Sequence, residues 1–147
     1  MKTLAEIIKL IESSNNPLAV RFEPLFYQRL KENNFNDRAI KRIKELHKCN
    51  TNTAYMIAST SWGLYQLMGY NLYFYDLTKK TVFEYLFDEE EQEQAFQKFI
   101  EKRKINFTVE ELKSDPEKIR KFAKYYNGDV ESYSRKIKKL LEVVQYV

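Results

Sequence analysis

The sequence predicts one mostly helical α+β domain that spans residues 1–147 and has a small β element near its N-terminus. Three glycines and three prolines are too few turn residues for a many-stranded sandwich or barrel. Apolar residues recur at helical spacing along most of the chain and alternate in one short segment only. Because 44% of the residues are of the AVILMFWYC class and 31% are charged, the composition favours a packed core over disorder.

The N-terminal part should contain a helix followed by the β element. Thr3-x-x-Glu6 is a capping box, and the helix it begins should end near Ser13, where a run of turn residues precedes Pro17. Apolar and other residues then alternate over residues 18–23, which predicts a short strand that ends before Pro24. Helices are expected over about residues 25–33 and over residues 54–68, the second with an interruption near residue 63. Between them, another helix should begin after a cap at residue 37.

The C-terminal part is predicted to be helical almost throughout. Residues 70–75 are aromatic and have no clear period, so they are interpreted as irregular. Residues 81–104 predict two helices joined around the acidic run 88–91, which suits the first turn of a helix. A second capping box, Thr108-x-x-Glu111, the pair Asp115-Pro116 and Gly128 mark two further helices, and the last helix begins near Val130.

Composition excludes several classes of function. One cysteine and one histidine cannot supply a disulfide framework, a multi-ligand Cys/His metal site or most catalytic triads, so carboxylates must carry any proton chemistry and no cofactor is expected. The net charge is +4, but acidic and basic residues are interspersed, which argues against nucleic acid as a partner. No apolar run is long enough for stable membrane insertion, and the charged N-terminus does not resemble a signal peptide.

Two carboxylates are the candidate catalytic residues. Glu12 lies four residues after Ile8 at the border of the apolar helix face, in the last helical turn, where burial and the helix dipole should keep its proton bound. A general acid that works at neutral pH needs this property. Glu23 is predicted to share a strand face with Arg21, which favours its ionised form, and two carboxyls in different environments suit glycoside hydrolysis. The plainer alternatives are a surface glutamate at position 12 and a simple Arg21–Glu23 pair.

Four segments in one order carry a family resemblance. They are Glu12-Ser13, Arg21-Phe22-Glu23, Ser61-Trp62-Gly63-Leu64-Tyr65-Gln66-Leu67-Met68-Gly69 and Tyr126-Asn127-Gly128. Together they resemble the N-acetylmuramidase family of phage endolysins, which belongs to the lysozyme-like group, and they are also similar to segments of lytic transglycosylases and goose-type lysozymes. The nine-residue segment is the most specific of the four, and the late pair Tyr133 and Lys136 matches the family's closing Tyr-x-x-Lys.

The resemblance implies a lysozyme-like cleft enzyme that cuts the β-1,4 bond between N-acetylmuramic acid and N-acetylglucosamine in peptidoglycan. It implies that Glu12 is the general acid and that Gln66 lines the cleft and bonds sugar or water. Gly63 would let the backbone pass close to the glycan, and Tyr65 is a candidate sugar contact. Tyr126 and Asn127 would hold the sugar beside the acid. Trp62 is expected to be a core residue rather than a sugar platform.

Two other activities stay open on the sequence. A lytic transglycosylase would act on the same bond and would need one carboxyl, so the role of Glu23 transfers less securely than that of Glu12. A non-catalytic wall-binding component of a phage would retain the fold without the chemistry. In each case the partner is the peptidoglycan glycan strand, the protein is expected to be a monomer, and it should stay in the host cytoplasm until another protein releases it to the wall.

Overall fold

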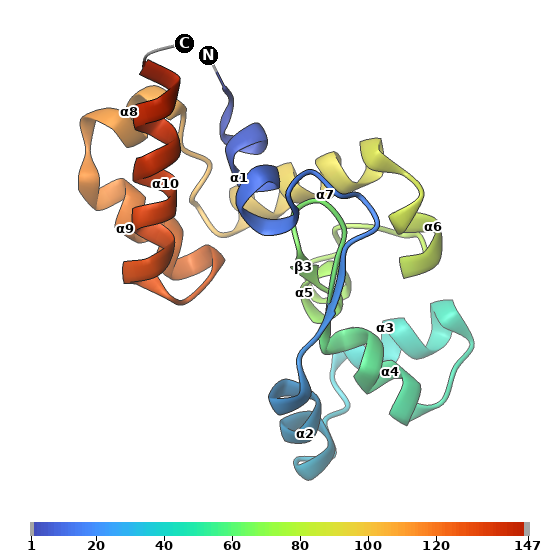
Figure 1. Cartoon of the computed structure of the whole chain (residues 1–147). Helices are drawn as coiled ribbons and strands as arrows, with labels where there is room; N and C mark the ends of the chain where they lie inside the picture. Colours follow the sequence, from blue (N-terminus) through green and yellow to red (C-terminus); the bar gives the residue numbers. More distant parts are fainter. Residues whose placement is uncertain (1, 146–147) are drawn as a thin grey trace.

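The computed structural model describes residues 2–145, and it confirms a mostly helical α+β fold with a small antiparallel sheet near the N-terminus (Figure 1). The strands are β1 (Val20–Phe22), β2 (Thr60–Trp62) and β3 (Leu67–Met68). The helices are α1 (Leu4–Ser13), α2 (Pro24–Glu32), α3 (Arg38–His47), α4 (Thr51–Ala58), α5 (Gly69–Phe74), α6 (Val82–Leu86), α7 (Glu89–Lys102), α8 (Val109–Ser114), α9 (Pro116–Tyr126) and α10 (Val130–Gln145).

The helix starts follow the capping signals in the sequence. Thr3 and Thr108 form complete capping boxes with the glutamates three residues later, and Asp37 accepts a hydrogen bond from the Ile40 N–H. Asp115 caps α9, whose first residue is a proline. These local bonds satisfy amide groups that a helix end otherwise leaves unpaired, so the sequence places these four starts correctly.

The sheet has the order β1-β2-β3, and both neighbouring pairs are antiparallel. Arg21 is opposite Ser61 in the first pair, and Ser61 is opposite Met68 in the second. The four residues 63–66 connect β2 to β3, and the turn starts and ends with residues of positive φ, Gly63 and Gln66. The predicted strand near the N-terminus is therefore the first strand of a three-stranded sheet.

The prediction of a helix over residues 54–68 was wrong in its second half. The helix ends at Ala58, because the Ser59 and Thr60 hydroxyls donate to the carbonyls of Tyr55 and Met56 in the last turn of α4. The β2–β3 hairpin follows directly. Its uncharged residues are buried on both faces, so the segment lacks the alternation that would have marked it as strand.

Residues 70–75 were predicted to be irregular, and all of them except residue 75 instead lie in the short helix α5. Tyr70 and Phe74 lie one turn apart and stack, with ring centroids 5.5 Å apart and planes inclined by 15°. The Arg38 guanidinium lies 4.8 Å from the centre of the Phe74 ring and donates to the Phe74 carbonyl at the end of the helix. Aromatic pairing and this contact with α3 stabilise a helix that the sequence pattern does not show.

The elements form two groups on either side of α1 and the sheet (Figure 1). One group contains α8, α9 and α10, and the other contains α2, α3, α4 and α5. Helix α10 packs on α9 and on α1, which joins the end of the chain to its beginning. Helix α7 runs behind the centre of the molecule and buries Phe96, Phe99 and Ile100 in the core. The gap between the two groups lies at the exposed end of α1 and along β1.

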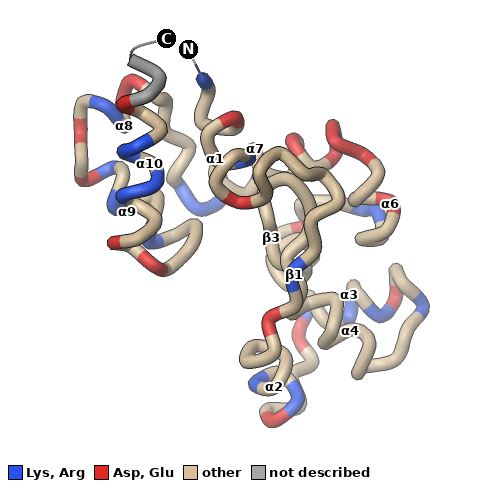
Figure 2. Tube along the Cα trace, viewed as in Figure 1, with Lys and Arg blue, Asp and Glu red and all other residues tan. Residues whose placement is uncertain are grey.

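Acidic and basic residues are mixed over both groups, as Figure 2 shows. None of the helices in residues 2–145 is long and apolar enough to cross a bilayer.

Candidate active site

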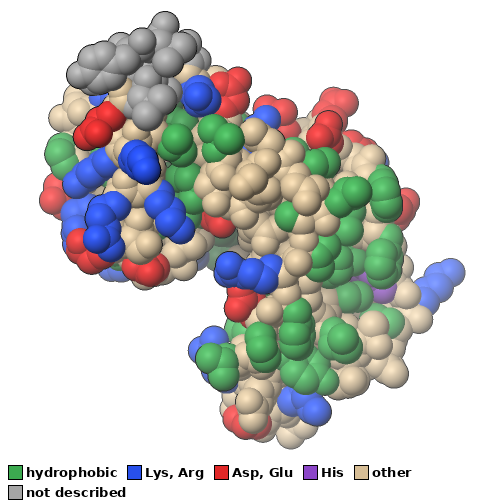
Figure 3. All heavy atoms as spheres, in the orientation of Figure 1, with side chains coloured by type: hydrophobic (Ala, Val, Ile, Leu, Met, Phe, Trp, Pro, Cys, Tyr) green, Lys and Arg blue, Asp and Glu red, His purple; other side chains and the backbone are tan. Residues whose placement is uncertain are grey.

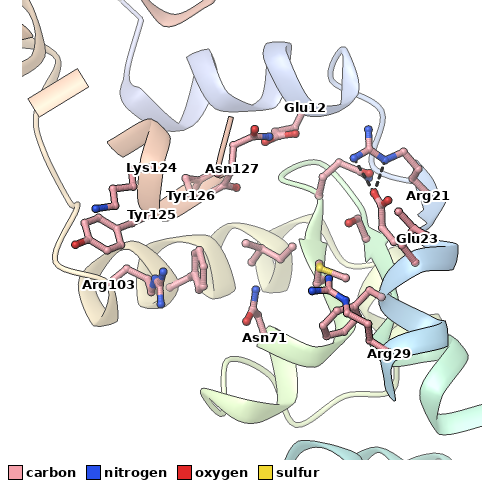
Figure 4. A pocket seen from close by; sticks show the side chains of 18 residues that line it. Glu12, Arg21, Glu23, Arg29, Asn71, Arg103, Lys124, Tyr125, Tyr126 and Asn127 are labelled. Atoms are coloured by element: carbon pink, nitrogen blue, oxygen red, sulfur yellow. Dashed lines mark hydrogen bonds and ion pairs between the residues drawn. The ribbon is translucent and has the colours of Figure 1, made fainter. Parts of the chain in front are cut away.

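A cleft of about 540 Å³ lies between the two groups of elements and is lined by α1, β1, α2, the sheet, α7 and α9 (Figure 4). This size is in the range of ligand pockets in proteins. Figure 3 shows the same region as a hollow in the surface with basic and acidic side chains at its narrowest part. Five of the predicted site residues line this cleft, and they are Glu12, Glu23, Gln66, Tyr126 and Asn127.

Glu12 lies in the last turn of α1 and is partly buried in the cleft wall. The Tyr133 hydroxyl donates a 2.9 Å hydrogen bond to Glu12 Oε2, and this is the one hydrogen bond to its carboxyl among the described residues. Burial raises the pKa of Glu12 above its ordinary value, while the Tyr133 hydrogen bond and the charges of Arg21 and Lys136 lower the pKa by less. The side chain can therefore hold a proton at a higher pH than an exposed glutamate.

Ser13 fixes the end of α1 against the hairpin. Its hydroxyl donates to the Lys9 carbonyl at 3.1 Å and to the Leu64 carbonyl, 51 residues later, at 2.8 Å. The next residue, Ser14, has a left-handed conformation and ends the helix. In the pair Glu12-Ser13, the first residue therefore supplies a carboxyl to the cleft. The second holds the last turn of α1 beside the β2–β3 connection.

Glu23 lies across the cleft from Glu12, at the junction of β1 and α2 (Figure 4). Arg21 donates to Glu23 Oε1 through Nε at 2.9 Å and Nη2 at 2.7 Å. The Glu23 side chain makes no cap bond to α2. Both guanidinium contacts go to Oε1, and the second oxygen has no hydrogen-bond partner among the described residues. A pair between Arg21 and Glu23 was predicted from the sequence.

Gln66 occupies the last position of the hairpin turn, with a positive φ of 52°. Its Nε2 donates to the Gly63 carbonyl at 2.9 Å and to the Ala19 carbonyl at 3.1 Å, so the amide ties the turn to the segment that precedes β1. Both bonds use the nitrogen. The amide oxygen has no partner among the described residues, and it is left as an acceptor at the cleft.

Tyr126 and Asn127 end helix α9 at the cleft. The Tyr126 hydroxyl donates to the Tyr65 carbonyl at 2.7 Å, and its ring stacks on Phe122 with centroids 5.1 Å apart. The hydroxyl is therefore bonded within the protein, and Tyr126 forms part of the cleft wall. Asn127 is exposed, and its side-chain oxygen accepts from the Asp129 N–H, so its amide nitrogen is free for a ligand.

The structure corrects the expectations for Tyr65 and Gly63. The Tyr65 side chain is 0% exposed and stacks in the core on the Phe96 ring, with ring centroids 4.3 Å apart. Gly63 is a point of close approach, but to the protein: a Cβ at this position would lie 2.3 Å from Gln92 Oε1. Neither residue lines the cleft.

Gln92 explains why a glycine is needed at position 63. It is a fully buried side chain of α7, its Oε1 accepts from the Leu64 N–H at 2.7 Å, and its Nε2 donates to the carbonyls of Pro17, Tyr85 and Leu86. The hairpin turn is thus held by a buried amide from a distant helix. Trp62 is 7% exposed and donates to the Ile57 carbonyl, which confirms it as a core residue.

Sequence reasoning missed several groups at the cleft. Tyr133 was noted only for its spacing to Lys136, and its contact with Glu12 joins residues 121 positions apart. Arg29, Arg103, Lys124 and Tyr125 also line the cleft and carried no pattern that would have singled them out. No group of three or more histidine, cysteine, aspartate or glutamate side chains within residues 2–145 is arranged to hold a metal ion.

Comparison with known proteins decides the family. A sequence model of N-acetylmuramidases matches residues 10–145, which contain all of the cleft residues discussed above. The chain belongs to the N-acetylmuramidase family. Consistent with this, the chain is similar to an endolysin of Enterobacteria phage PRD1, with 40% identity over 134 residues, covering 90% of this chain and 89% of that endolysin. The resemblance drawn from the four sequence segments is confirmed. No solved structure matches the chain.

Proposed function

We propose that this N-acetylmuramidase family member degrades peptidoglycan by cutting the β-1,4 bond between N-acetylmuramic acid and N-acetylglucosamine, with Glu12 as the general acid. The observation that carries the proposal is the state of Glu12, a partly buried carboxyl in the cleft wall whose pKa is raised by burial. The family match and the similarity to a phage endolysin support peptidoglycan as the substrate.

In the first step, protonated Glu12 gives its proton to the glycosidic oxygen as the bond from this oxygen to C1 of the muramic acid breaks. The Tyr133 hydroxyl, which donates to Oε2, leaves Oε1 to carry the proton. The leaving sugar departs with a neutral hydroxyl. Positive charge builds up on C1 and the ring oxygen of the muramic acid.

Glu23 is proposed to act on this positive charge from the other side of the cleft. Its carboxylate can stabilise the cation, in which case the water that adds to C1 gives its proton to the Glu12 carboxylate. Alternatively, Glu23 takes this proton from the water and releases it to solvent, and Glu12 takes up a proton from solvent. Arg21 holds the carboxylate through two contacts to one oxygen, so the other oxygen is available. The amide groups of Gln66 and Asn127 are suited to the sugar's N-acetyl and hydroxyl groups.

The decisive test combines a substitution with product analysis. Glu12→Gln keeps the size of the side chain and removes the acidic proton, so release of fragments from purified peptidoglycan should fall by at least about a hundredfold. Glu32→Gln is the matched control, because Glu32 also ends a helix but is exposed and lies outside the cleft. A folded Glu12→Gln protein with near-native activity would contradict the assignment.

Mass spectrometry of the released fragments identifies the reaction. Reducing muramic acid ends support hydrolysis, and reducing N-acetylglucosamine ends would show that the other glycosidic bond is cut. Ends with a 1,6-anhydro ring would show that the sugar's own C6 hydroxyl replaces water, which is transglycosylation. Absence of fragments with retained binding to the wall would show a non-catalytic component.

A further inference from the structure

One wall of the cleft carries more positive than negative charge. The two cleft carboxylates lie near Arg21 and Tyr133, which contact them directly. Arg29, Arg103 and Lys124 also line the cleft, and none of these three cations forms an ion pair with an acidic group of the described residues. Figure 4 shows Arg103 and Lys124 on the same wall, on either side of Tyr125, and Arg29 on the opposite wall.

Arg103 and Lys124 are brought together by one aromatic ring. The Arg103 guanidinium carbon and the Lys124 Nζ each lie 5.4 Å from the centre of the Tyr125 ring, which is 39% exposed. The ring attracts both cations, and the two like charges repel each other. An anion that contacts both cations would offset this repulsion, whereas a neutral sugar would not.

Arg103 is also partly removed from solvent without a counter-charge. Its Nη1 donates to the Tyr75 hydroxyl at 3.1 Å, and its Nε is buried and has no hydrogen-bond partner. Removing a guanidinium from water costs free energy unless an acceptor replaces the lost water. The Tyr75 contact fixes the direction of the planar group, which leaves its remaining N–H groups available to a carboxylate.

We propose that Arg103, Lys124 and Tyr125 form a subsite for the free carboxylates of the peptides attached to the muramic acid residues. This inference rests on the proposed function, because it assumes that a glycan strand occupies the cleft. The sugars themselves are uncharged once the lactyl group carries its peptide, so the peptide carboxylates are the anions that enter the cleft with the strand. The subsite would select strands whose peptides carry free carboxylates over strands whose peptide carboxylates are neutralised.

The test compares two soluble substrates that differ only in charge. One is a set of peptidoglycan fragments with free carboxyl groups, and the other is the same set after conversion of these groups to amides with carbodiimide and ammonia. The KM of the wild-type protein should be about tenfold lower for the free carboxylates, with kcat little changed. The double variant Arg103→Gln/Lys124→Gln should lose this difference, so that its KM values for the two substrates become equal.

A matched control separates local contacts from overall charge. Lys98→Gln/Lys138→Gln removes the same two charges from exposed positions on α7 and α10 that lie outside the cleft, and it should keep the tenfold preference. Lys124→Gln alone removes an exposed side chain and should keep part of the preference, which covers the case in which the double variant does not fold.

The outcomes distinguish the two proposals. Equal KM values of the wild-type protein for both substrates would overturn the subsite and leave the proposed function intact. Loss of the preference in the control variant would also overturn the subsite, because the effect would then follow net charge. If the wild-type protein cuts neither substrate, the proposed function fails and the subsite fails with it.

Discussion

Glu12 combines a useful property for catalysis with a cost for folding. Its pKa is raised by burial in the folded protein, so the unfolded chain gives up this proton at a lower pH than the folded chain. The stability of the folded state should therefore decrease as the pH rises from about 4.5 through the raised pKa. Glu12→Gln removes this decrease. We expect the variant to raise the melting temperature more at pH 7 than at pH 4, and an equal change at both pH values would contradict the argument.

Tyr133 also affects the pKa of Glu12. Its hydrogen bond lowers the pKa of Glu12 and so opposes part of the effect of burial. Tyr133→Phe keeps the ring packing and removes the bond, and the pKa of Glu12 should rise further. Because the proposed reaction needs the protonated form of Glu12, the alkaline limb of the pH–activity profile should move to higher pH. A profile that is unchanged, or that moves to lower pH, would show that Tyr133 does not act through Glu12.

The single residues that could be predicted from the sequence are those with local signals. Glu12 follows from helical spacing and from its place in the last turn, and Arg21 and Glu23 are two residues apart, in β1 and directly after it. Tyr65 was misplaced because its core partner Phe96 lies 31 residues away, so no local pattern shows the contact. The cation pair at Tyr125 could not be predicted, since Arg103 and Lys124 come from α7's end and α9 and have no common pattern.

At the scale of elements, the β2–β3 turn is predicted to be the least tolerant part of the site. Gly63→Ala places a Cβ against buried Gln92 at a φ of +79°, and it should reduce the free energy of unfolding by about 3 kcal/mol. Gly128→Ala is the control, because Gly128 also has a positive φ, +94°, but nothing lies within 4 Å of an added Cβ. It should lose only about 1 kcal/mol. Urea unfolding measures both, and equal losses would show that the Gln92 contact is unimportant.

His47 joins α3 to α6 and should make this junction sensitive to acid. Its Nε2 accepts a 3.0 Å hydrogen bond from the Val82 N–H, which only the neutral ring can do. Burial lowers the pKa of His47 below its ordinary value of 6.5, so stability that is complete above pH 6.5 is lost as the pH falls through the lowered pKa. The melting temperature should fall between pH 7 and pH 5 by more in the wild-type protein than in His47→Gln, and the reverse order would exclude this role.

Helix starts were predictable and the hairpin was not, for a physical reason. Caps are interactions between residues two or three apart, so they are present in the sequence itself. The hairpin depends on Gln92, which hydrogen-bonds to Leu64 from 28 residues away, and its strands are too short to show alternation. The sequence contained the glycine that the turn requires but not the partner that explains it.

On the scale of the whole molecule, charge is distributed so that attraction to polyanions is weak. Lys and Arg exceed Asp and Glu by 25 − 21 = 4, and both signs occur in both groups of elements (Figure 2). Binding to a DNA duplex depends on many phosphate contacts made together by one basic surface. We expect no mobility shift of a duplex at about 0.15 M salt with micromolar protein, because screening acts over about 8 Å. A stable complex under these conditions would contradict this argument and support nucleic acid as a partner.

The hydrogen bond between Tyr133 and Glu12 has a consequence for the order in which the protein is made. Glu12 leaves the ribosome 121 positions before Tyr133, the residue of α10 that donates to its carboxyl. A nascent chain that ends before α10 cannot make this contact. If the proposed role of Glu12 is right, its surroundings in the cleft wall are complete only after α10 has been synthesised and has packed on α1.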